Sequence, residues 1–251
     1  MKKYAFGVDI GGTTCKIGFF DTNGTLLDKW EIKTNTENNG ESILSDVAKA
    51  VDNKLAQEAI SKDDVQGIGI GVPGPVDSQG VVHRCVNLGW GVVNVAEELG
   101  NLTGLTIKVG NDANVAALGE MWQGGAKGSK DVIMVTLGTG VGEIGHITVN
   151  NDEIEACNCG QYGCLEQYTS ATGIVRLAKR KLAKSSEETS IREIPNLTAK
   201  DVFDAAKAGD AIAIGLVDEV CEILGSTLSN IACVVNPEII VIGGGVSKAG
   251  D

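Results

Sequence analysis

Glycine-rich segments follow directly after apolar strands at three points along the chain, and this pattern restricts the fold more than any other feature. The strands are predicted at residues 4–10, 132–137 and 238–242, and the segments read Gly11-Gly12-Thr13-Thr14, Gly138-Thr139-Gly140 and Gly243-Gly244-Gly245. Glycine reaches positive φ and lets the backbone approach a bulky anion. Each segment alone is compatible with an ordinary tight turn, but the three together predict nucleotide-binding loops, with the third admitting an adenosine.

Helical and strand periodicities alternate along the rest of the chain. Apolar spacing predicts helices at residues 42–60, 93–99, 111–122, 169–184, 198–207 and 210–231. Further strands are predicted at residues 15–20, 25–33, 65–72 and 105–109. Such alternation is typical of α/β layers. Because a glycine hairpin opens each half, we expect two related lobes around a central cleft, a smaller one at residues 1–110 and a larger one at residues 111–251.

The first glycine turn has a carboxylate at its entrance. Asp9 ends the predicted strand, and the turn supplies Gly11, Gly12, Thr13 and Thr14. Threonine hydroxyls and backbone N–H groups can donate to phosphate oxygens, and Asp9 could hold a hydrated Mg²⁺. The segment matches neither GxxxxGK[ST] nor GxGxxG, so an ordinary hairpin stays open as an alternative.

Asn111 and Asp112 lie where a predicted strand passes into a helix. Side chains of this type cap helices, which is the simpler interpretation. Residues at strand ends of open α/β sheets also face the ligand crevice. A carboxylate there can accept a proton from a hydroxyl that attacks a γ-phosphate. Beside the glycine loops, we favour Asp112 as a catalytic base.

Three cysteines cluster in the second half as Cys157, Cys159 and Cys164, with the spacing C-x-C-x4-C. His146 is the nearest histidine, whereas His83 is distant in sequence. Three thiolates and one imidazole make a closed tetrahedral zinc site without an open position for water. We therefore predict a structural zinc ion, with three unrelated thiols as the alternative.

Charge and hydropathy exclude some classes of protein. The net charge is −12 and no basic block stands out, which argues against a nucleic-acid partner. No run of about 18 apolar residues occurs, so no membrane span is expected. The N-terminal residues lack the apolar region and cleavage site of a signal peptide, so we expect a cytoplasmic protein.

Seven motifs, taken in order, resemble those of the ROK-family sugar kinases, and most closely the glucokinases of that family. They are DIGGT at 9–13, GVPGPVD at 71–77, GNDAN at 110–114, GTG at 138–140, EIGH at 143–146, CNCGQYGCLE at 157–166 and GGG at 243–245. The glycine loops are weak markers alone, while EIGH with CNCGxxGCLE is highly specific. The match spans nearly the whole chain.

The resemblance implies an actin-like ATPase fold of the ribonuclease-H-like, hexokinase type. It implies transfer of the γ-phosphate of ATP to O6 of a hexose, most simply glucose, with Asp112 as base. The sugar contacts that it implies are Gly74, Asn111, Asp112, Glu143, His146 and Glu166. It also implies that the phosphates of the nucleotide meet residues 11–13 and 138–140, that zinc is held by the ligands named above, and that the protein is a homodimer.

Several alternatives stay open at this point. Another hexose or an N-acetylhexosamine could be the substrate, and polyphosphate could be the donor. The ROK family also includes sugar-responsive repressors, which carry a DNA-binding helix-turn-helix ahead of DIGGT. Only eight residues precede Asp9 here, and the chain is acidic, so we favour the kinase.

Two departures from the family pattern concern segments that similar proteins contain. A sizeable segment usually separates GTGVG from EIGH, whereas here Gly142 runs directly into Glu143 and leaves little room for a returning strand. The chain also stops soon after Gly245, before helices that usually complete the nucleotide lobe. We therefore expect the sequence to be an incomplete version of a longer protein.

Overall fold

The computed structural model describes residues 2–249, and for Glu143 it describes the backbone alone. The chain divides into two compact units, Met1–Gly124 and Gly125–Asp251. The sequence-based division was placed after residue 110, whereas this one falls after the helix that follows it. That helix packs on two strands of the first unit, which is why it belongs there.

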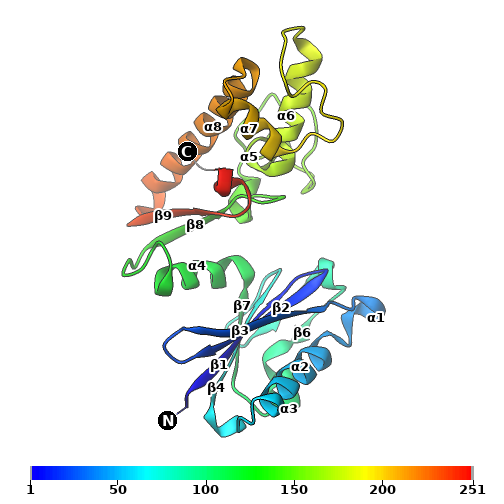
Figure 1. Cartoon of the computed structure of the whole chain (residues 1–251), viewed down its shortest axis with the longest axis vertical. Coiled ribbons are helices and arrows are strands. Elements are labelled where there is room, and N and C mark those ends of the chain that lie inside the picture. The colour runs from blue at the N-terminus through cyan, green and yellow to red at the C-terminus, as the bar shows by residue number, and fades with distance from the viewer. Residues whose placement is uncertain (1, 250–251) are drawn as a thin grey trace. The chain divides into compact units, whose positions relative to one another are not determined.

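A five-stranded mixed sheet forms the frame of the first unit, in the order β3-β2-β1-β4-β7 (Figure 1). Its strands are β1 (Tyr4–Ile10), β2 (Thr14–Asp21), β3 (Leu26–Lys33), β4 (Val65–Val72) and β7 (Ile107–Asn111). β1, β2 and β3 pair antiparallel, while β4 and β7 run parallel to β1. The carboxyl ends of three parallel strands therefore lie at one edge of the sheet.

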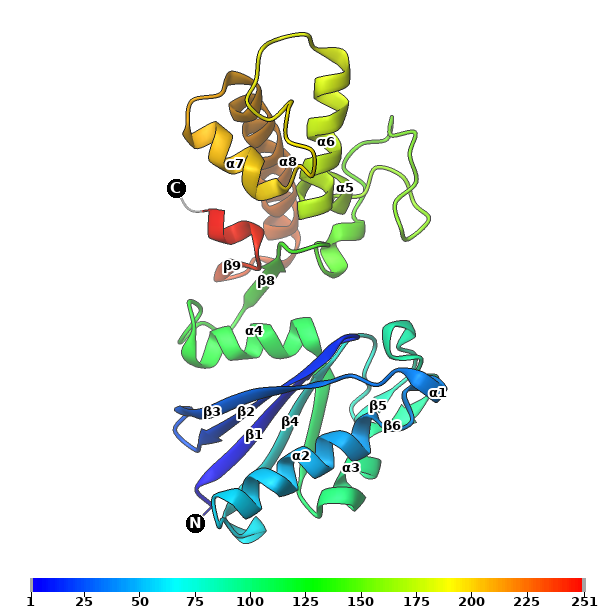
Figure 2. The ribbon, with the colours of Figure 1, turned by 45° about the vertical axis from the view of Figure 1, so that its right-hand side comes forward.

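Helices cover both faces of this sheet. They are α1 (Glu37–Gly40), α2 (Ile43–Gln57), α3 (Val95–Thr103) and α4 (Asp112–Gln123). Figure 2 shows α4 on the face opposite α2 and α3. Short elements complete the unit: η1 (Lys62–Asp64), β5 (Val81–Val82), η2 (Val86–Leu88) and β6 (Val93–Asn94).

The core of the first unit follows from alternating side chains on the strands. Ile10, Ile17 and Ile70 are almost fully buried, and they share one hydrophobic cluster with Val47 and Val51 of α2. The spacing of the two valines puts them on one face of the helix. Burial of such side chains is the main source of stability for the sheet.

A two-stranded parallel sheet and a group of helices form the second unit. The strands are β8 (Val132–Thr136) and β9 (Ile239–Gly243). The helices are η3 (Glu143–His146), α5 (Glu166–Thr169), α6 (Ala171–Lys184), α7 (Ala199–Lys207), α8 (Ala211–Val235) and η4 (Val246–Ala249). Ile174, Val202 and Leu216 bring α6, α7 and α8 into one buried cluster.

The second glycine turn differs from the predicted hairpin. Among the described residues, β8 has no antiparallel partner, and Gly142 leads directly into η3. The reason is the direct junction of Gly142 with Glu143, which leaves no residues for a returning strand. The helix expected at 169–184 is α6 and begins at Ala171, because Ser170 caps it by accepting from the Gly173 N–H at 2.9 Å.

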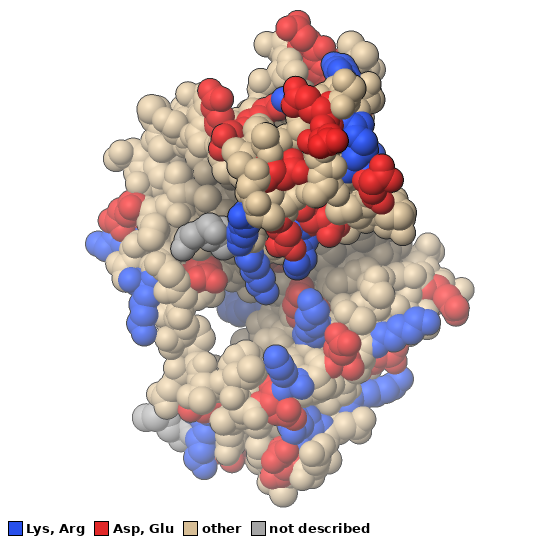
Figure 3. Space-filling model, turned by 45° about the horizontal axis from the view of Figure 1, so that its top comes forward, with Lys and Arg blue, Asp and Glu red and all other residues tan. Residues whose placement is uncertain are grey.

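Charged side chains are mixed over the surface drawn in Figure 3, where Lys and Arg are scattered among Asp and Glu. None of the helices in the described part of the chain combines the length and hydropathy that a membrane span requires.

Candidate functional site

Several predicted residues of the first unit lie at the carboxyl edge of its parallel strands. Asp9 of β1 is in register with Gly71 of β4, and Gly71 is in register with Gly110 of β7. The turn of residues 11–14 and the segment with Gly74 therefore begin next to each other. Asn111 ends β7 at the same edge. Ligands of open α/β sheets bind at such edges.

Asn111 joins two of these segments through its amide. Its Oδ1 accepts from the N–H groups of Ala113 and Asn114 at 3.1 and 3.2 Å, so it caps α4. Its Nδ2 donates to the Gly74 carbonyl at 3.2 Å. Gly74 has φ +123, and a Cβ there would lie 2.6 Å from the Arg84 carbonyl oxygen. Helix capping and the predicted contact role thus share one side chain.

Asp112 is the first residue of α4 and is exposed. Its Oδ1 accepts from the Ala113 N–H at 2.8 Å. A Cβ on Gly71 would lie 3.4 Å from the Cα of Asp112, so β4 and the start of α4 approach closely. Burial raises the pKa of Asp9; Lys16 opposes this, and the Asp112 charge adds to it. The two carboxylates thus lie near enough for the charge of Asp112 to act on Asp9.

Thr34, which none of the sequence motifs includes, stabilises the turn between β1 and β2. Gly11 N–H donates to the Thr14 carbonyl at 3.0 Å. Thr34 Oγ1 donates to the Gly11 carbonyl at 2.6 Å, and its N–H donates to the Thr13 carbonyl at 3.0 Å. Gly12 and Thr13 stay exposed. The signal available in the sequence was a threonine immediately after the strand at 25–33.

The two glycine segments of the second unit meet at the carboxyl end of β8 and β9. Leu137 N–H donates to the Gly243 carbonyl at 2.8 Å. Gly244 has φ +94, and a Cβ there would lie 2.4 Å from the Leu137 carbonyl oxygen, which only glycine avoids. Thr172 Oγ1 donates to the Thr139 carbonyl at 3.0 Å, so the start of α6 supports the turn with Gly138 and Gly140.

Glu166 connects this turn to the cysteine cluster. Its Oε2 accepts from the Val141 N–H at 3.2 Å, and its Oε1 lies 3.8 Å from the Cys157 sulfur. A Cβ on Gly140 would lie 2.4 Å from Oε2, so the carboxylate occupies the space that this glycine leaves. The two segments are 25 residues apart in sequence, and only the fold brings them together.

The cluster of three cysteines and one histidine has the shape of a metal site. The ligand atoms of His146, Cys157, Cys159 and Cys164 all lie within 4.8 Å of one another. The sulfurs of Cys159 and Cys164 are 3.6 Å apart, close to the roughly 3.8 Å edge of a tetrahedron with Zn–S bonds of about 2.3 Å. The residues present therefore fit a tetrahedral zinc ion.

Two glycines shape the loop that carries these ligands. Gly160 and Gly163 have φ +87 and +69. A Cβ on Gly163 would lie 1.7 Å from the Asn150 carbonyl oxygen, whereas nothing lies within 4 Å of one on Gly160. Gly163 is thus required both for its backbone conformation and for close packing.

The thiols differ in their surroundings. The Gln161 N–H lowers the pKa of Cys159, whereas burial raises the pKa of Cys164 to about 12, with further increases from the neighbouring thiols. A bound dication would favour the thiolate form of each, since metal-coordinating thiols are deprotonated. His146 is exposed. The side chain of Glu143, predicted as a sugar contact, lies outside the described part of the structure.

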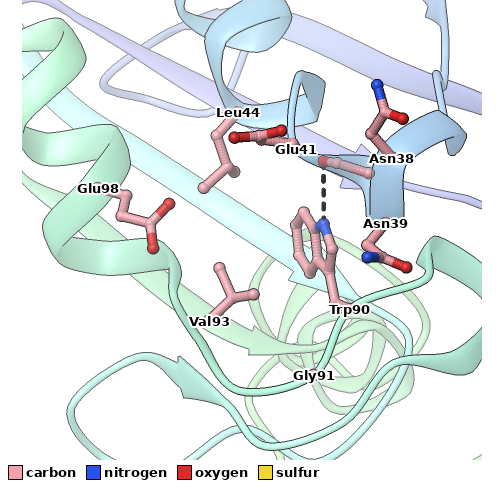
Figure 4. A pocket seen from close by; sticks show the side chains of 9 residues that line it. Asn38, Asn39, Glu41, Leu44, Trp90, Gly91, Val93 and Glu98 are labelled. Carbon is pink, nitrogen blue, oxygen red and sulfur yellow. Dashed lines mark hydrogen bonds between the residues drawn. The ribbon is translucent and has the colours of Figure 1, made fainter.

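A pocket of about 350 Å³ in the first unit is lined by other residues (Figure 4). Trp90 forms its buried wall and donates from Nε1 to the Gly40 carbonyl at 3.1 Å. Leu44, Val93 and Glu98 point toward the indole, while the Asn38 side chain points away (Figure 4). None of the predicted site residues lines this pocket.

Comparison with known proteins gives the family. The sequence profile of the ROK family matches residues 5–143 and 141–251. A glucokinase of Halalkalibacterium halodurans is 44% identical over 271 residues, covering 99% of this chain and 82% of that protein. A glucokinase of Thermotoga maritima is 34% identical and covers 98% of this chain and 83% of that protein. The chain belongs to the ROK family.

Solved structures agree with this assignment. A ROK family glucokinase from Streptomyces griseus in complex with glucose and AMPPNP superposes with a TM-score of 0.74 at 32% identity, covering 98% of this chain and 85% of that one. A ROK hexokinase from Thermus thermophilus gives a TM-score of 0.77 at 28% identity, covering 99% and 84%. The chain therefore has the actin-like α/β fold of this family.

The family match also breaks inside the chain. Its two segments overlap at residues 141–143, the junction of Gly142 and Glu143. The alignment with the Halalkalibacterium relative extends over 271 residues, more than the 251 of this chain, so it opens gaps in this chain. The break coincides with the place where the motifs stand unusually close and β8 leads directly into η3.

Proposed function

We propose that this protein transfers the γ-phosphate of ATP to O6 of glucose, giving glucose 6-phosphate and ADP. The observation that carries the proposal is the 44% identity to a glucokinase over 99% of the chain. The glucokinase from Streptomyces griseus, whose structure contains glucose and AMPPNP, supports it independently.

Asp112 is proposed as the catalytic base. It follows the carboxyl end of β7 and is exposed at the start of α4. From there its carboxylate can remove the proton of the O6 hydroxyl as the oxygen attacks the γ-phosphate. The N-terminus of α4 stabilises negative charge at this position. The sugar then needs to be held with O6 next to the carboxylate.

Sugar contacts are proposed from both units. In the first unit, Asn111 has a second N–H beside the one that Gly74 occupies, and this can donate to a hydroxyl. In the second unit, Glu143, His146 and Glu166 are proposed contacts, because carboxylates and imidazoles bind hydroxyls well. The Glu166 carboxylate is already fixed by the Val141 N–H at 3.2 Å.

Nucleotide contacts are proposed from the three glycine segments. Gly11, Gly12, Thr13 and Thr14 offer backbone N–H groups and hydroxyls, as do Gly138, Thr139 and Gly140, while Gly243 and Gly244 leave room for the adenosine. Asp9 would hold the Mg²⁺ of MgATP, which neutralises charge on the phosphates. The Asp9 side chain is 59% exposed and lies 4.0 Å from the Lys16 ammonium group, so its carboxylate is accessible to a hydrated cation.

Zinc is proposed at His146, Cys157, Cys159 and Cys164, where it would crosslink the loop without entering the reaction. The loop then presents Glu166, two residues after Cys164, in a fixed position. We further propose that the protein works in the cytoplasm and as a homodimer. Elemental analysis of the zinc content tests the metal site. The molecular mass from light scattering tests the homodimer.

Other ROK proteins define the alternatives. An N-acetylgalactosamine kinase of Shewanella is 30% identical, and an N-acetyl-D-glucosamine kinase of Citrobacter koseri is 29% identical. Formation of the sugar phosphate should be measured across glucose, mannose, fructose, allose and the N-acetylhexosamines, with ATP and with polyphosphate as donor. The proposal predicts the highest kcat/KM for glucose with ATP. Preference for an N-acetylhexosamine or for polyphosphate would overturn it.

A further inference from the structure

Glu153 is a buried carboxylate surrounded by donors. Its side chain is only 1% exposed. Oε2 accepts from Tyr168 Oη at 2.7 Å, from Arg176 Nη2 at 2.7 Å and from Arg180 Nη1 at 2.8 Å. Oε1 accepts from the N–H groups of the next two residues at 3.0 and 3.1 Å. All the acceptor capacity of the carboxylate is thus used inside the protein.

Arg176 connects Glu153 to the metal loop, the segment from Cys157 to Cys164 that holds the three cysteines. Its Nη1 pairs with Glu155 Oε2 at 2.7 Å, and its Nε donates to the Gln167 carbonyl at 3.3 Å. The guanidinium also lies 5.4 Å from the centre of the Tyr168 ring. Charge-assisted bonds of this kind are directional and strong when shielded from water. Hydrogen bonding to Arg176, followed by Arg180 and Tyr168, lowers the pKa of Glu153 far below its usual range, so it stays charged.

Gln167 completes the connection. Its Nε2 donates to the Glu155 carbonyl at 2.9 Å, and its Oε1 accepts from the Cys164 N–H at 3.1 Å. Glu155 lies two residues before Cys157, and Gln167 lies three residues after Cys164. The network therefore fixes the backbone on both sides of the ligand loop, although none of its members belongs to the four-residue metal cluster.

We infer that Glu153 is a positioning residue for the metal ligands, acting through Arg176 and Gln167 to set the distance between Cys157 and Cys164 before the metal binds. The inference rests on the proposed zinc site. Outer residues that orient metal ligands typically change metal affinity by about 10- to 100-fold when they are replaced. A purely structural brace would change unfolding but leave the zinc affinity of the folded protein unaltered.

The test is zinc affinity of the full chain, measured by competition with a chromophoric chelator. Glu153→Gln keeps the volume and removes the charge, and Asp204→Asn, which breaks the exposed Lys200–Asp204 pair of the same unit, is the matched control. We expect Glu153→Gln to raise the zinc Kd at least about tenfold and the control to leave it unaltered. Circular dichroism checks that each variant is folded.

The outcomes separate this inference from the proposed function. A folded Glu153→Gln with the zinc Kd of the wild type would overturn the positioning role alone. If that variant does not fold, Arg180→Lys, which weakens one of the donors, should still raise the Kd severalfold, and an unchanged value would overturn the inference. Failure of the wild type to bind zinc would overturn both the metal site and the inference. Glucose phosphorylation is tested by a separate activity assay, so the two failures can be told apart.

Discussion

Replacement of Asn111 separates its capping of α4 from its hydrogen bond to the Gly74 carbonyl. Asn111→Ala removes the cap of α4, which costs about 1 kcal/mol, and the bond to the Gly74 carbonyl, which costs about 1 kcal/mol more. Asn111→Ser keeps a hydroxyl that can cap the helix but cannot reach Gly74. We therefore expect the free energy of unfolding to fall by about 2 kcal/mol in the alanine variant and about 1 kcal/mol in the serine variant.

The chain offers a convenient assay for this series. Its three tryptophans, Trp30, Trp90 and Trp122, all lie in the first unit, so their fluorescence follows unfolding of that unit in urea. The KM for glucose should rise at least about tenfold in both variants, because a lost hydrogen bond to substrate is worth about 1.4 kcal/mol or more. Equal stability of the alanine and serine variants, or an unaltered KM, would refute the reasoning.

Two further perturbations test the metal loop and the acid response. Gly163→Ala should abolish zinc retention and lower the Tm strongly, because the new Cβ would meet the Asn150 carbonyl. Gly160→Ala should lower the free energy of unfolding by only about 1 kcal/mol. Similar behaviour of the two variants would contradict the packing argument. Burial opposes ionisation of Asp210, but donors from Ser190, Ala213 and Thr189 lower its pKa from 3.8 to about 2. Its stabilisation is therefore present above pH 4 and lost as pH falls through 2. Asp210→Asn should lower the free energy of unfolding by about 1 kcal/mol at pH 7, with the exposure of the group allowed for, and by almost nothing near pH 2. An equal loss of stability at both pH values would exclude this dependence on the ionisation of Asp210.

Local features of the fold could be predicted from the sequence because they depend on neighbouring residues. The strand at 65–72 was placed correctly, since its apolar run ends at a proline. The helix predicted at 93–99 continues to Thr103. It ends there because Gly104 takes the left-handed conformation, φ +70, and the glycine was the signal that could have marked this end.

The site was predictable where its residues are contiguous and not where the fold unites distant segments. The spacing of the three cysteines predicted that their sulfurs converge, and these sulfurs lie within 4.8 Å of one another and of a ring nitrogen of His146. The bond of Asn111 to Gly74 joins residues 37 apart in sequence, and nothing local announces it. Glu153 lies in an acidic stretch whose sequence resembles a solvated loop. It is buried because the fold brings Arg176 and Arg180 of α6 into ion pairs with it.

Asp112→Asn tests the central claim most directly. The substitution keeps the shape of the side chain and removes the base, so kcat for glucose with ATP should fall by about 10²- to 10⁴-fold. The glucose Kd from calorimetry should stay within about threefold of the wild-type value, since the base acts in the transition state. Turnover close to that of the wild type, in a variant that binds glucose normally, would contradict the account.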